Sequence, residues 1–213
     1  MIDLAQLTAA VEAGDRQAAV QVTEAAIREG LSAQEILDAM TLAMDTVGGR
    51  FSSGEIFVPE MLISARAMKE AMALLEPLIA NAGIEPAHTA VIGTVKGDLH
   101  DIGKNLVAVM WKGAGIGIVD LGTNVPAEQF ILAAKEHGAD LIGVSALLTT
   151  TMGAMRDVVT AVRAGDLPNA KVIVGGAPLT ADFALEIGAD GYAPDAGAAV
   201  VVARSLLGEV ALG

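Results

Sequence analysis

The spacing of hydrophobic and polar residues changes near residue 85, and this change divides the chain into two halves. Up to about residue 81, apolar side chains recur every three or four positions, which is the period of amphipathic helices. Asp15 can cap the second of these helical stretches. Ser32 followed by Glu35 has the capping-box pattern, so we expect a third helix to begin there and to run to about Thr46.

A glycine-rich segment, 48–58, separates this third helix from a fourth. We expect the segment to be a loop because its sequence is irregular as well as rich in glycine. Pro59 then occupies a favoured first helical position, and Glu60 suits the positive end of the helix dipole. An apolar stripe follows, formed by Met61, Ala65, Met68, Met72 and Leu75. Residues 1–84 are therefore predicted to form an all-α domain, a four-helix bundle.

Beyond a turn-rich break at 81–86, short apolar runs alternate with helical patterns. The runs have the length of strands and lie at 89–95, 116–121, 140–145, 171–174 and about 190–192. The helical patterns between and after them lie at about 104–113, 126–137, 151–164, 180–187 and 195–207. Strands that are apolar throughout and alternate with helices indicate a parallel sheet covered on both faces. We therefore predict that residues 85–213 form an α/β domain with a doubly wound, flavodoxin- or Rossmann-like sheet of five parallel strands.

Composition excludes several classes of function. The chain of 213 residues is 53% hydrophobic and 18% charged, which is enough for packed cores, and its formal net charge is −13. No basic block is present, so we expect no nucleic-acid partner. Cysteine is absent, so any bound metal must use histidine or carboxylate ligands. The sequence shows neither a signal-peptide pattern nor an apolar run of membrane-spanning length, and we expect a cytoplasmic protein without a membrane partner.

The residues best suited to bind a metal or a ligand follow the first predicted strand. His100 can serve as a metal ligand through a neutral imidazole, and Asp98 is close enough in sequence to hold the second ring nitrogen. One histidine is too few for an ordinary zinc site, and His88 and His137 belong to other parts of the chain. A single axial histidine suits a metal whose remaining ligands come from a macrocycle.

Three motifs in this half match one family. Asp98-Leu99-His100-Asp101-Ile102-Gly103 has the Asp-x-His-x-x-Gly pattern of cobalamin-binding domains. Ser145-Ala146-Leu147 resembles their Ser-x-Leu motif, and Gly175-Gly176 resembles their paired glycines. The segment 54–61 also resembles the helical cap domain of the same group. The chain is thus similar to the small corrinoid proteins of methyltransferase systems and to the cobalamin-binding module of methionine synthase.

The resemblance implies roles for individual residues. His100 would replace the dimethylbenzimidazole tail of cobalamin as the lower ligand of cobalt, Asp98 would accept a hydrogen bond from its ring, and Thr151 would complete a relay. Phe57 and Met61 would shield the upper face, although Phe57 could equally staple the helical bundle. The remaining expected cofactor contacts are Gly97, Leu99, Asp101, Ile102, Gly103, Ser145, Leu147, Thr149, Gly175 and Gly176. Lys104 could neutralise a phosphate of the nucleotide tail or could simply be solvated.

The function that the resemblance implies is that of a methyl carrier. Cobalamin would be bound base-off and His-on, and would pass between Co(I) and methyl-Co(III) as it moves a methyl group from a substrate-specific methyltransferase to an acceptor methyltransferase. The acceptor enzyme would use tetrahydrofolate or a thiol coenzyme, a reductive activation protein would restore Co(I), and the linker 81–88 would act as a hinge. Alternatives are a cobalamin-dependent sensor or regulatory protein, a subunit of a radical isomerase, and an FMN protein. The methyl donor, the lower base of the corrinoid and the oligomeric state stay open.

Overall fold

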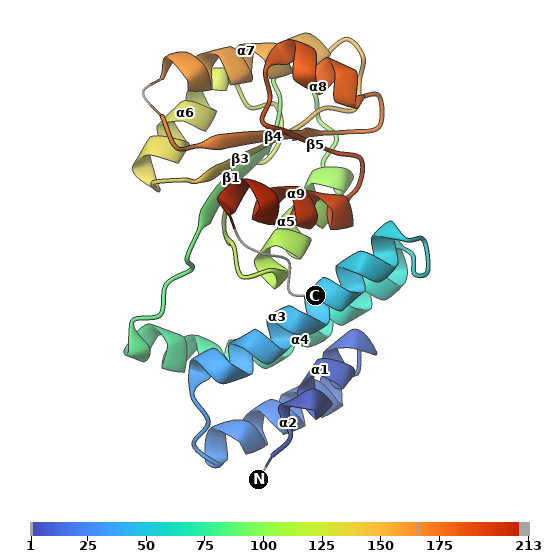
Figure 1. Ribbon diagram of the computed structural model, residues 1–213, viewed down its shortest axis with the longest axis vertical. Helices are drawn as coiled ribbons and strands as arrows, with labels where there is room; N and C mark the ends of the chain where they lie inside the picture. The colour runs from blue at the N-terminus through green and yellow to red at the C-terminus, as the bar shows by residue number, and fades with distance from the viewer. Residues whose placement is uncertain (1, 166, 209–213) are drawn as a thin grey trace. The chain divides into compact units, whose positions relative to one another are not determined.

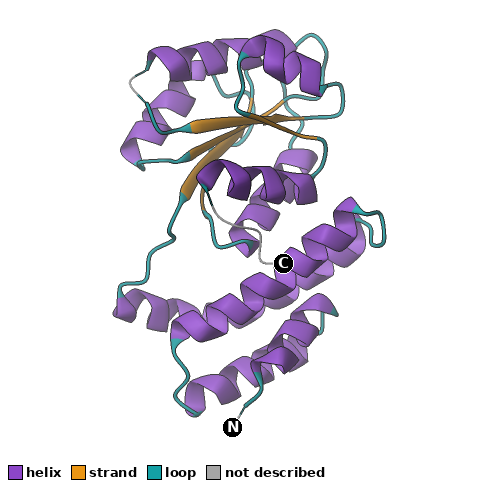
Figure 2. Ribbon diagram, in the orientation of Figure 1, coloured by secondary structure: helices purple, strands orange, loops and turns teal. Residues whose placement is uncertain are grey.

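The chain forms two compact units (Figure 1). The computed structural model describes residues 2–165 and 167–208. The first unit extends to Pro86 and also includes Gly113–Gly115, and the second consists of Ala87–Lys112 and the residues from Ile116 onward. The first unit is built from helices and the second has a central sheet, so each is described by itself (Figure 2).

Four helices make up the first unit, as predicted. They are α1 (Leu4–Glu12), α2 (Arg16–Arg28), α3 (Ala33–Ser52) and α4 (Val58–Ala82). The side chain of Asp15 caps α2 by accepting a hydrogen bond of 3.0 Å from the amide of Ala18. At the start of α3, Ser32 Oγ accepts from the Glu35 amide at 3.2 Å, and Glu35 accepts from the Ser32 amide at 2.9 Å. The expected capping box is therefore confirmed.

The end of α3 differs from the prediction. The segment after Thr46 continues as helix to Ser52, so the prediction of a loop was wrong for residues 48–52. Gly48 is buried on the same face of α3 as Met44, and burial of this face stabilises a helix whose glycines would otherwise disfavour it. The chain turns only at Gly54, whose φ of +75° suits glycine.

The second unit contains five parallel strands in the order β2-β1-β3-β4-β5. The strands are β1 (Thr89–Thr94), β2 (Gly117–Asp120), β3 (Leu141–Ser145), β4 (Lys171–Gly175) and β5 (Gly191–Ala193). The helices are α5 (Ile102–Gly113), α6 (Ala127–Glu136), α7 (Met152–Ala164), α8 (Ala181–Ile187) and α9 (Ala196–Leu207). In Figure 1, α5 and α9 cover one face of the sheet, and α6, α7 and α8 cover the other. The predicted doubly wound sheet is thus confirmed.

Two glycines inside strands make room for the largest core side chains. On one face, a Cβ added at Gly93 would lie 2.9 Å from the ring of Phe130. On the other face, a Cβ added at Gly143 would lie 2.9 Å from the ring of Trp111, whose indole N–H donates to the carbonyl of Ala199 at 3.0 Å. Both aromatic side chains are completely buried, so each face of the sheet has a close-packed core.

The strand order contains one switch point. The chain leaves β1 toward β2 and leaves β3 toward β4, so the connections that follow these neighbouring strands run in opposite directions. In doubly wound sheets, ligands bind at this switch point, beyond the carboxyl ends of the strands. The loops at this edge are 95–101 after β1 and 146–151 after β3. Both of the principal sequence motifs therefore meet at the switch point.

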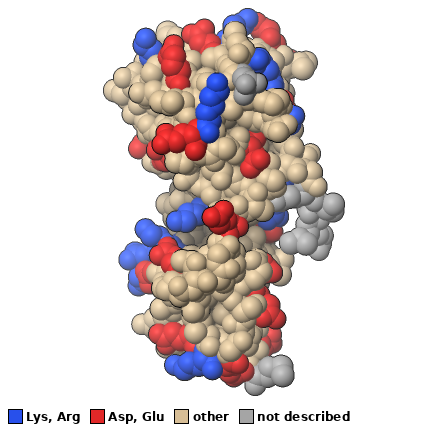
Figure 3. All heavy atoms as spheres, turned by 90° about the vertical axis from the view of Figure 1, so that its left-hand side faces the viewer, with Lys and Arg blue, Asp and Glu red and all other residues tan. Residues whose placement is uncertain are grey.

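Charged side chains of both signs share the surface. In Figure 3, Lys and Arg lie among Asp and Glu over the face shown. Some form exposed ion pairs, such as Arg16 with Glu70 at 2.9 Å and Arg156 with Glu186 at 2.6 Å. Such pairs contribute about 0–1 kcal/mol each. Within the described residues, none of the helices combines the length and the apolar character needed to cross a membrane.

Replacing Gly49 by alanine should test how far α3 extends. Gly49 lies in the last turns of α3, and an added Cβ meets no atom within 4 Å, so Gly49→Ala should raise the free energy of unfolding by about 0.5–1 kcal/mol. Gly54→Ala is the matched control, since its Cβ also has open space but its φ is +75°. Strain in this left-handed conformation should lower the free energy of unfolding by about 1–2 kcal/mol. Urea denaturation measures both changes, and a loss of stability in Gly49→Ala would contradict the helical extension.

Candidate functional site

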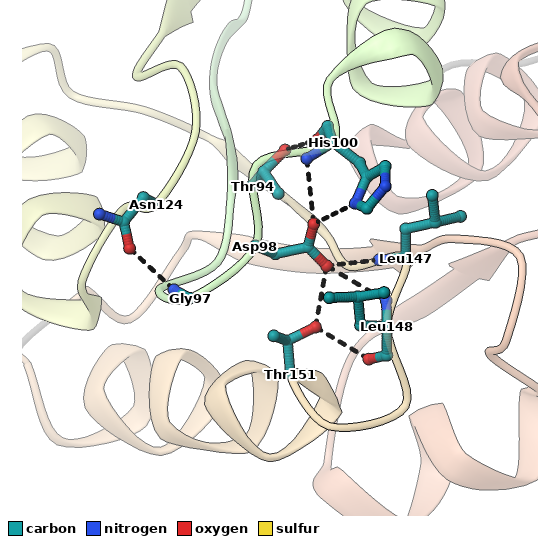
Figure 4. A network of polar contacts seen from close by, with 8 residues as sticks. All are labelled: Thr94, Gly97, Asp98, His100, Asn124, Leu147, Leu148 and Thr151. Atoms are coloured by element: carbon teal, nitrogen blue, oxygen red, sulfur yellow. Dashed lines mark hydrogen bonds and ion pairs between the residues drawn. The ribbon is translucent and has the colours of Figure 1, made fainter.

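The carboxylate of Asp98 lies at the centre of the switch point and joins its two loops (Figure 4). Its Oδ1 accepts hydrogen bonds from the amide of His100 at 3.0 Å and from Nδ1 of the same residue at 2.9 Å. Its Oδ2 accepts from the amides of Leu147 at 2.8 Å and Leu148 at 3.2 Å. The hydroxyl of Thr151 also lies 2.8 Å from Oδ2. Asp98 is 0% exposed, so all of its partners are protein groups from loops far apart in sequence.

These contacts determine the charge of Asp98. Burial by itself raises the pKa of a carboxyl group. Here the donated hydrogen bonds from the amides of Leu147 and His100, the His100 ring and the Thr151 hydroxyl outweigh burial and hold the pKa of Asp98 well below its usual range. The side chain is therefore an anion at neutral pH.

The charge of Asp98 in turn fixes the tautomer of His100. A carboxylate only accepts hydrogen bonds, so Nδ1 of His100 must carry the hydrogen that it shares with Asp98. In the neutral ring, Nε2 then has a free lone pair directed away from the carboxylate. The His100 side chain is 52% exposed, and its outer nitrogen can thus reach a ligand outside the fold. This is the arrangement of a metal-binding imidazole held by a carboxylate.

Thr151 belongs to the same network, as its predicted role requires. It is 8% exposed and precedes the first residue of α7. Its Oγ1 lies 2.8 Å from Asp98 Oδ2 and 2.8 Å from the carbonyl oxygen of Leu148. A hydroxyl has one hydrogen, so Thr151 can donate fully to only one of these acceptors at a time. The geometry brings together the three predicted residues, and the relay itself stays a prediction.

Exposed apolar side chains lie next to His100 in sequence and in the loop after β3. Leu99 and Ile102, on either side of His100 in sequence, are 74% and 75% exposed, and Leu147 and Leu148 are 40% and 41% exposed. Large apolar side chains grouped at the surface mark a ligand or partner site. One metal-ligating nitrogen within such a surface fits a large, partly apolar group better than a hydrated ion.

Gly103 adds an open space to this surface. A Cβ at Gly103 would meet no atom within 4 Å, and its φ is not in the left-handed region, so the fold itself does not require glycine there. Gly97 is different, because its φ of +86° demands glycine in the turn that leads to Asp98. The space at Gly103 matches the expectation that a bulky group passes close to the start of α5.

The paired glycines have a structural explanation within the chain. Gly176 has a φ of +141°, and a Cβ there would collide with the carbonyl oxygen of Ala146. A Cβ at Gly175 would lie 3.0 Å from the carbonyl oxygen of Ala193. Gly176 is thus required by the close approach of two loops, and Gly175 leaves room between the neighbouring strands β4 and β5. The contact of both glycines with a nucleotide tail stays a prediction. Thr149, in the loop after β3, is exposed.

The structure supports neither of the two roles considered for Lys104, phosphate neutralisation or a solvated surface position. Its side chain is only 2% exposed, and Nζ lies 2.7 Å from each carboxylate oxygen of Asp120 and 2.6 Å from Asn105 Oδ1. The ammonium group has three hydrogens, and these three acceptors can use all of them. Lys104 is therefore neither solvated nor free to neutralise a phosphate. A sequence signal existed, because Asp120 ends the strand next to β1 at the same edge of the sheet.

Asn124 is a site residue that the sequence reasoning missed. Its side-chain Oδ1 accepts from the backbone amide of Gly97 at 2.8 Å, and its backbone N–H donates to the backbone carbonyl of Asp98 at 2.9 Å. Its φ of +56° is a left-handed conformation that asparagine tolerates better than most residues. A Gly-Thr-Asn sequence after a predicted strand was the available signal of such a turn.

The two candidates from the helical unit differ in exposure. Phe57 is 67% exposed, and its amide donates to the Glu60 side chain at 3.0 Å at the start of α4. Met61 is 0% exposed and belongs, like Met68, to the buried residues of α4. The exposed ring of Phe57 is available to a cofactor, whereas Met61 is a core side chain. Their contact with a cofactor is untested and stays a prediction.

The protein offers one strong nitrogen ligand at this site and few others. Within the described parts of the chain, no group of three or more histidine, aspartate and glutamate side chains is placed to hold a metal ion. A metal bound through His100 must therefore take most of its ligands from a non-protein group. The donor set fits a macrocycle that supplies the equatorial ligands.

Comparison with known proteins agrees with this geometry. Residues 88–201 match a family model described as a B12 binding domain, and residues 3–76 match a second model with the same description. The chain is 40% identical over 211 residues to a corrinoid protein of Desulfitobacterium hafniense, covering 97% of this chain and 98% of that protein. It is 41% identical over 198 residues to dimethylamine corrinoid protein 3 of Methanosarcina acetivorans, covering 92% and 89%.

A solved structure extends the similarity. The chain resembles a chain of the methanol:cobalamin methyltransferase complex from Methanosarcina barkeri with a TM-score of 0.83 and 29% identity. The match covers 97% of this chain and 80% of that chain. Both units therefore have counterparts in a single known protein.

Replacing Asp98 by asparagine keeps the size of the side chain and removes its charge. Because the pKa of Asp98 is lowered by folding, the ionised form stabilises the fold above the unfolded-state pKa of about 3.9. That contribution is lost as pH falls toward the folded-state pKa. Asp98→Asn should lower the free energy of unfolding by about 3 kcal/mol at neutral pH. The difference from the wild type should shrink as the pH is lowered from about 5 to about 3, which urea denaturation can measure.

The neighbouring Asp101→Asn variant is the control for this experiment. The exposed Asp101 carboxylate accepts a hydrogen bond of 3.0 Å from Asn105 Nδ2, so its loss should cost less than about 1 kcal/mol at neutral pH. A deficit of Asp98→Asn that keeps its size down to about pH 3 would show that the buried anion is not its source.

Proposed function

This chain belongs to the B12-binding corrinoid proteins, and on that premise we propose that it carries a methyl group between two methyltransferases. The first enzyme would transfer the group from a substrate to the cofactor, and the second would pass it to an acceptor such as tetrahydrofolate or a thiol coenzyme. A reductive activation protein would return oxidised cofactor to the working cycle. The observation that carries the proposal is the contact between Asp98 and His100 Nδ1, which leaves Nε2 as an exposed ligand.

The similar proteins support a methyltransferase partner. One is a dimethylamine corrinoid protein, and another is part of a methanol:cobalamin methyltransferase complex. The first name joins a corrinoid to dimethylamine, and the second joins cobalamin to a methyltransferase and methanol. We propose the same class of substrate here, namely methanol, a methylamine or another small compound with a transferable methyl group.

We propose that His100 binds cobalt in a base-off, His-on complex. Cobalamin supplies the transfer chemistry, because its cobalt gains a methyl group as Co(I) and yields it from the Co(III) level. Asp98 accepts the Nδ1 hydrogen, which fixes the tautomer and the orientation of the ring. Thr151 adds a further donor to the same carboxylate and so adjusts how strongly Asp98 polarises the imidazole.

The apolar surface beside His100 would bind the corrin and limit the access of water. Leu99 and Ile102 would contact the lower side of the macrocycle, and Gly103 would leave room for the displaced tail. From the helical unit, we propose Phe57 as a contact with the upper side. Residues 81 and 82 of the predicted hinge 81–88 belong to α4, so we propose the shorter segment 83–88, which begins at Gly83 with a φ of +65°, as the hinge that access to both enzymes would require.

Reconstitution tests this function directly. The protein would be loaded with hydroxocobalamin, freed of excess cofactor by gel filtration and reduced to Co(I). Candidate methyltransferases would then be added with methanol, methylamines, methoxylated aromatics, glycine betaine or methylthiols. Loss of the Co(I) absorption with one enzyme and its donor is the expected result. A protein that retains no cobalamin after gel filtration would contradict the proposal.

Removing the imidazole should abolish the proposed axial bond. In His100→Ala loaded with cob(II)alamin, the electron paramagnetic resonance spectrum should lose the splitting from an axial protein nitrogen. His137→Ala is the matched control, because His137 caps α6 in the same unit and lies outside the polar network of Asp98. An unchanged axial signal in His100→Ala would exclude His100 as the ligand.

Filling the space at Gly103 should weaken cofactor binding without harming the fold. Gly103→Leu places a side chain where the chain itself has no atom within 4 Å, so thermal stability should fall little. Affinity for cobalamin should fall more than about tenfold, since overpacking of a fitted site costs roughly 1–3 kcal/mol. Quenching of the only tryptophan, Trp111, reports binding. Glu136→Leu on α6 is the control, and equal affinities of the two variants would argue against a close approach at Gly103.

A further inference from the structure

The backbone carbonyl of His100 is held by contacts that do not involve Asp98. Thr94 is the last residue of β1 and is 0% exposed, and its hydroxyl donates to the carbonyl oxygen of His100 at 2.8 Å. The amide of Thr94 donates to the carbonyl of Gly122 at 2.9 Å, and its own carbonyl accepts from Val125 at 2.9 Å. Thr94 therefore ties the His100 loop to the loop that follows β2.

The loop after β2 is fixed in turn by Asp120. Its Oδ1 accepts from the amide of Gly122 at 2.8 Å, which shapes the turn next to Thr94. Both oxygens of Asp120 accept from Lys104 Nζ at 2.7 Å. Lys104 lies in the first turn of α5, four residues after His100. The helix that follows the histidine is thus joined to the same loop.

Together these contacts form a closed ring. It runs from the His100 carbonyl through Thr94, Gly122 and Asp120 to Lys104, and returns to His100 along the covalent chain. This ring of contacts and the contacts that Asp98 makes to the loop after β3 meet only at His100. Asp98 therefore holds the imidazole and the backbone amide of His100, while the ring of contacts holds the carbonyl end of the same residue.

An axial ligand needs both constraints. A functional side chain must be held within about 0.5 Å of its working position, and orientation alone does not achieve this. Burying a lysine is costly unless its charge is paired, and an apolar side chain could fill the same space. A buried Lys104, paired with a carboxylate that is 41% exposed, is therefore better explained by positioning than by stability.

We infer that Thr94, Lys104 and Asp120 are positioning residues that hold the His100 backbone at the distance at which its imidazole can bind cobalt. The inference rests on the proposed function. It predicts that weakening the ring of contacts lowers the proportion of cobalamin bound through His100, although none of the three side chains is placed to touch the metal.

Thr94→Val is the sharpest test, since it removes one hydroxyl and nearly preserves shape. In protein loaded with cob(II)alamin, the ratio of His-on to His-off cofactor, read by electron paramagnetic resonance, should fall roughly threefold to tenfold, as expected for one lost hydrogen bond. Thr94→Ser should restore the ratio. Lys104→Met should lower it by a similar factor, because Asp120 can then be solvated and the fold is kept.

Arg163→Met is the matched control. It removes an ion pair of 2.8 Å with Asp190 in the same unit, outside the ring of contacts. Its His-on ratio should equal that of the wild type even if its melting temperature falls. In the cofactor-free protein, hydrogen exchange of segment 96–101 should accelerate in Thr94→Val and not in Arg163→Met, which gives a readout independent of cobalt.

The outcomes separate the two proposals. If wild-type protein binds cobalamin without an axial protein nitrogen, the proposed function fails in its His-on form. If the wild type is His-on and the Thr94 and Lys104 variants keep its ratio, the positioning inference is wrong and the proposed function stands. Equal reductions in the variants and in Arg163→Met would likewise overturn the inference, since they would reflect general destabilisation.

Discussion

One buried carboxylate organises the functional end of this protein. Asp98 accepts hydrogen bonds from groups in two loops, and it can do so only because strand order places β1 beside β3. Without these donors, burial would favour a neutral acid. With them, the side chain stays an anion, and its charge selects the tautomer of His100 that leaves Nε2 available. Fold topology, protonation and ligand chemistry are thus linked through a single residue.

The two sides of the His100 loop have different roles. The loop after β3 supplies donors to Asp98, which holds the imidazole and the backbone amide of His100, whereas Thr94 and the loop after β2 hold the carbonyl of His100. Each side also contains a buried charge, Asp98 in one case and Lys104 in the other. The first is satisfied by dipoles and the second by an opposite charge. An apolar surface lies beside them, so polar groups position a ligand that mainly apolar groups would contact.

Local patterns predicted most of this architecture, and long-range packing accounts for what they missed. Apolar runs predicted the five strands, and the Asp-x-His spacing predicted the contact between the Asp98 carboxylate and the His100 ring, because both residues lie in one turn. Continuation of α3 to Ser52 depends on burial of Gly48, which local propensity does not report. The partner of Lys104 is 16 residues away, and the need for Gly176 comes from a carbonyl of another loop. These long-range contacts form only when the strands have paired in their native order.

The distance along the chain between Asp98 and its partners has a consequence for biosynthesis. Leu147 and Thr151 lie 49 and 53 residues after Asp98, and α5, β2, α6 and β3 must be made in between. A nascent chain that ends before Leu147 contains the whole Asp-x-His motif but none of the donors that the loop after β3 supplies to the buried carboxylate. Closing such a long loop is a late, non-local event in folding. The ligand site therefore matures after the third strand has docked, and cofactor capture during translation must wait for that step.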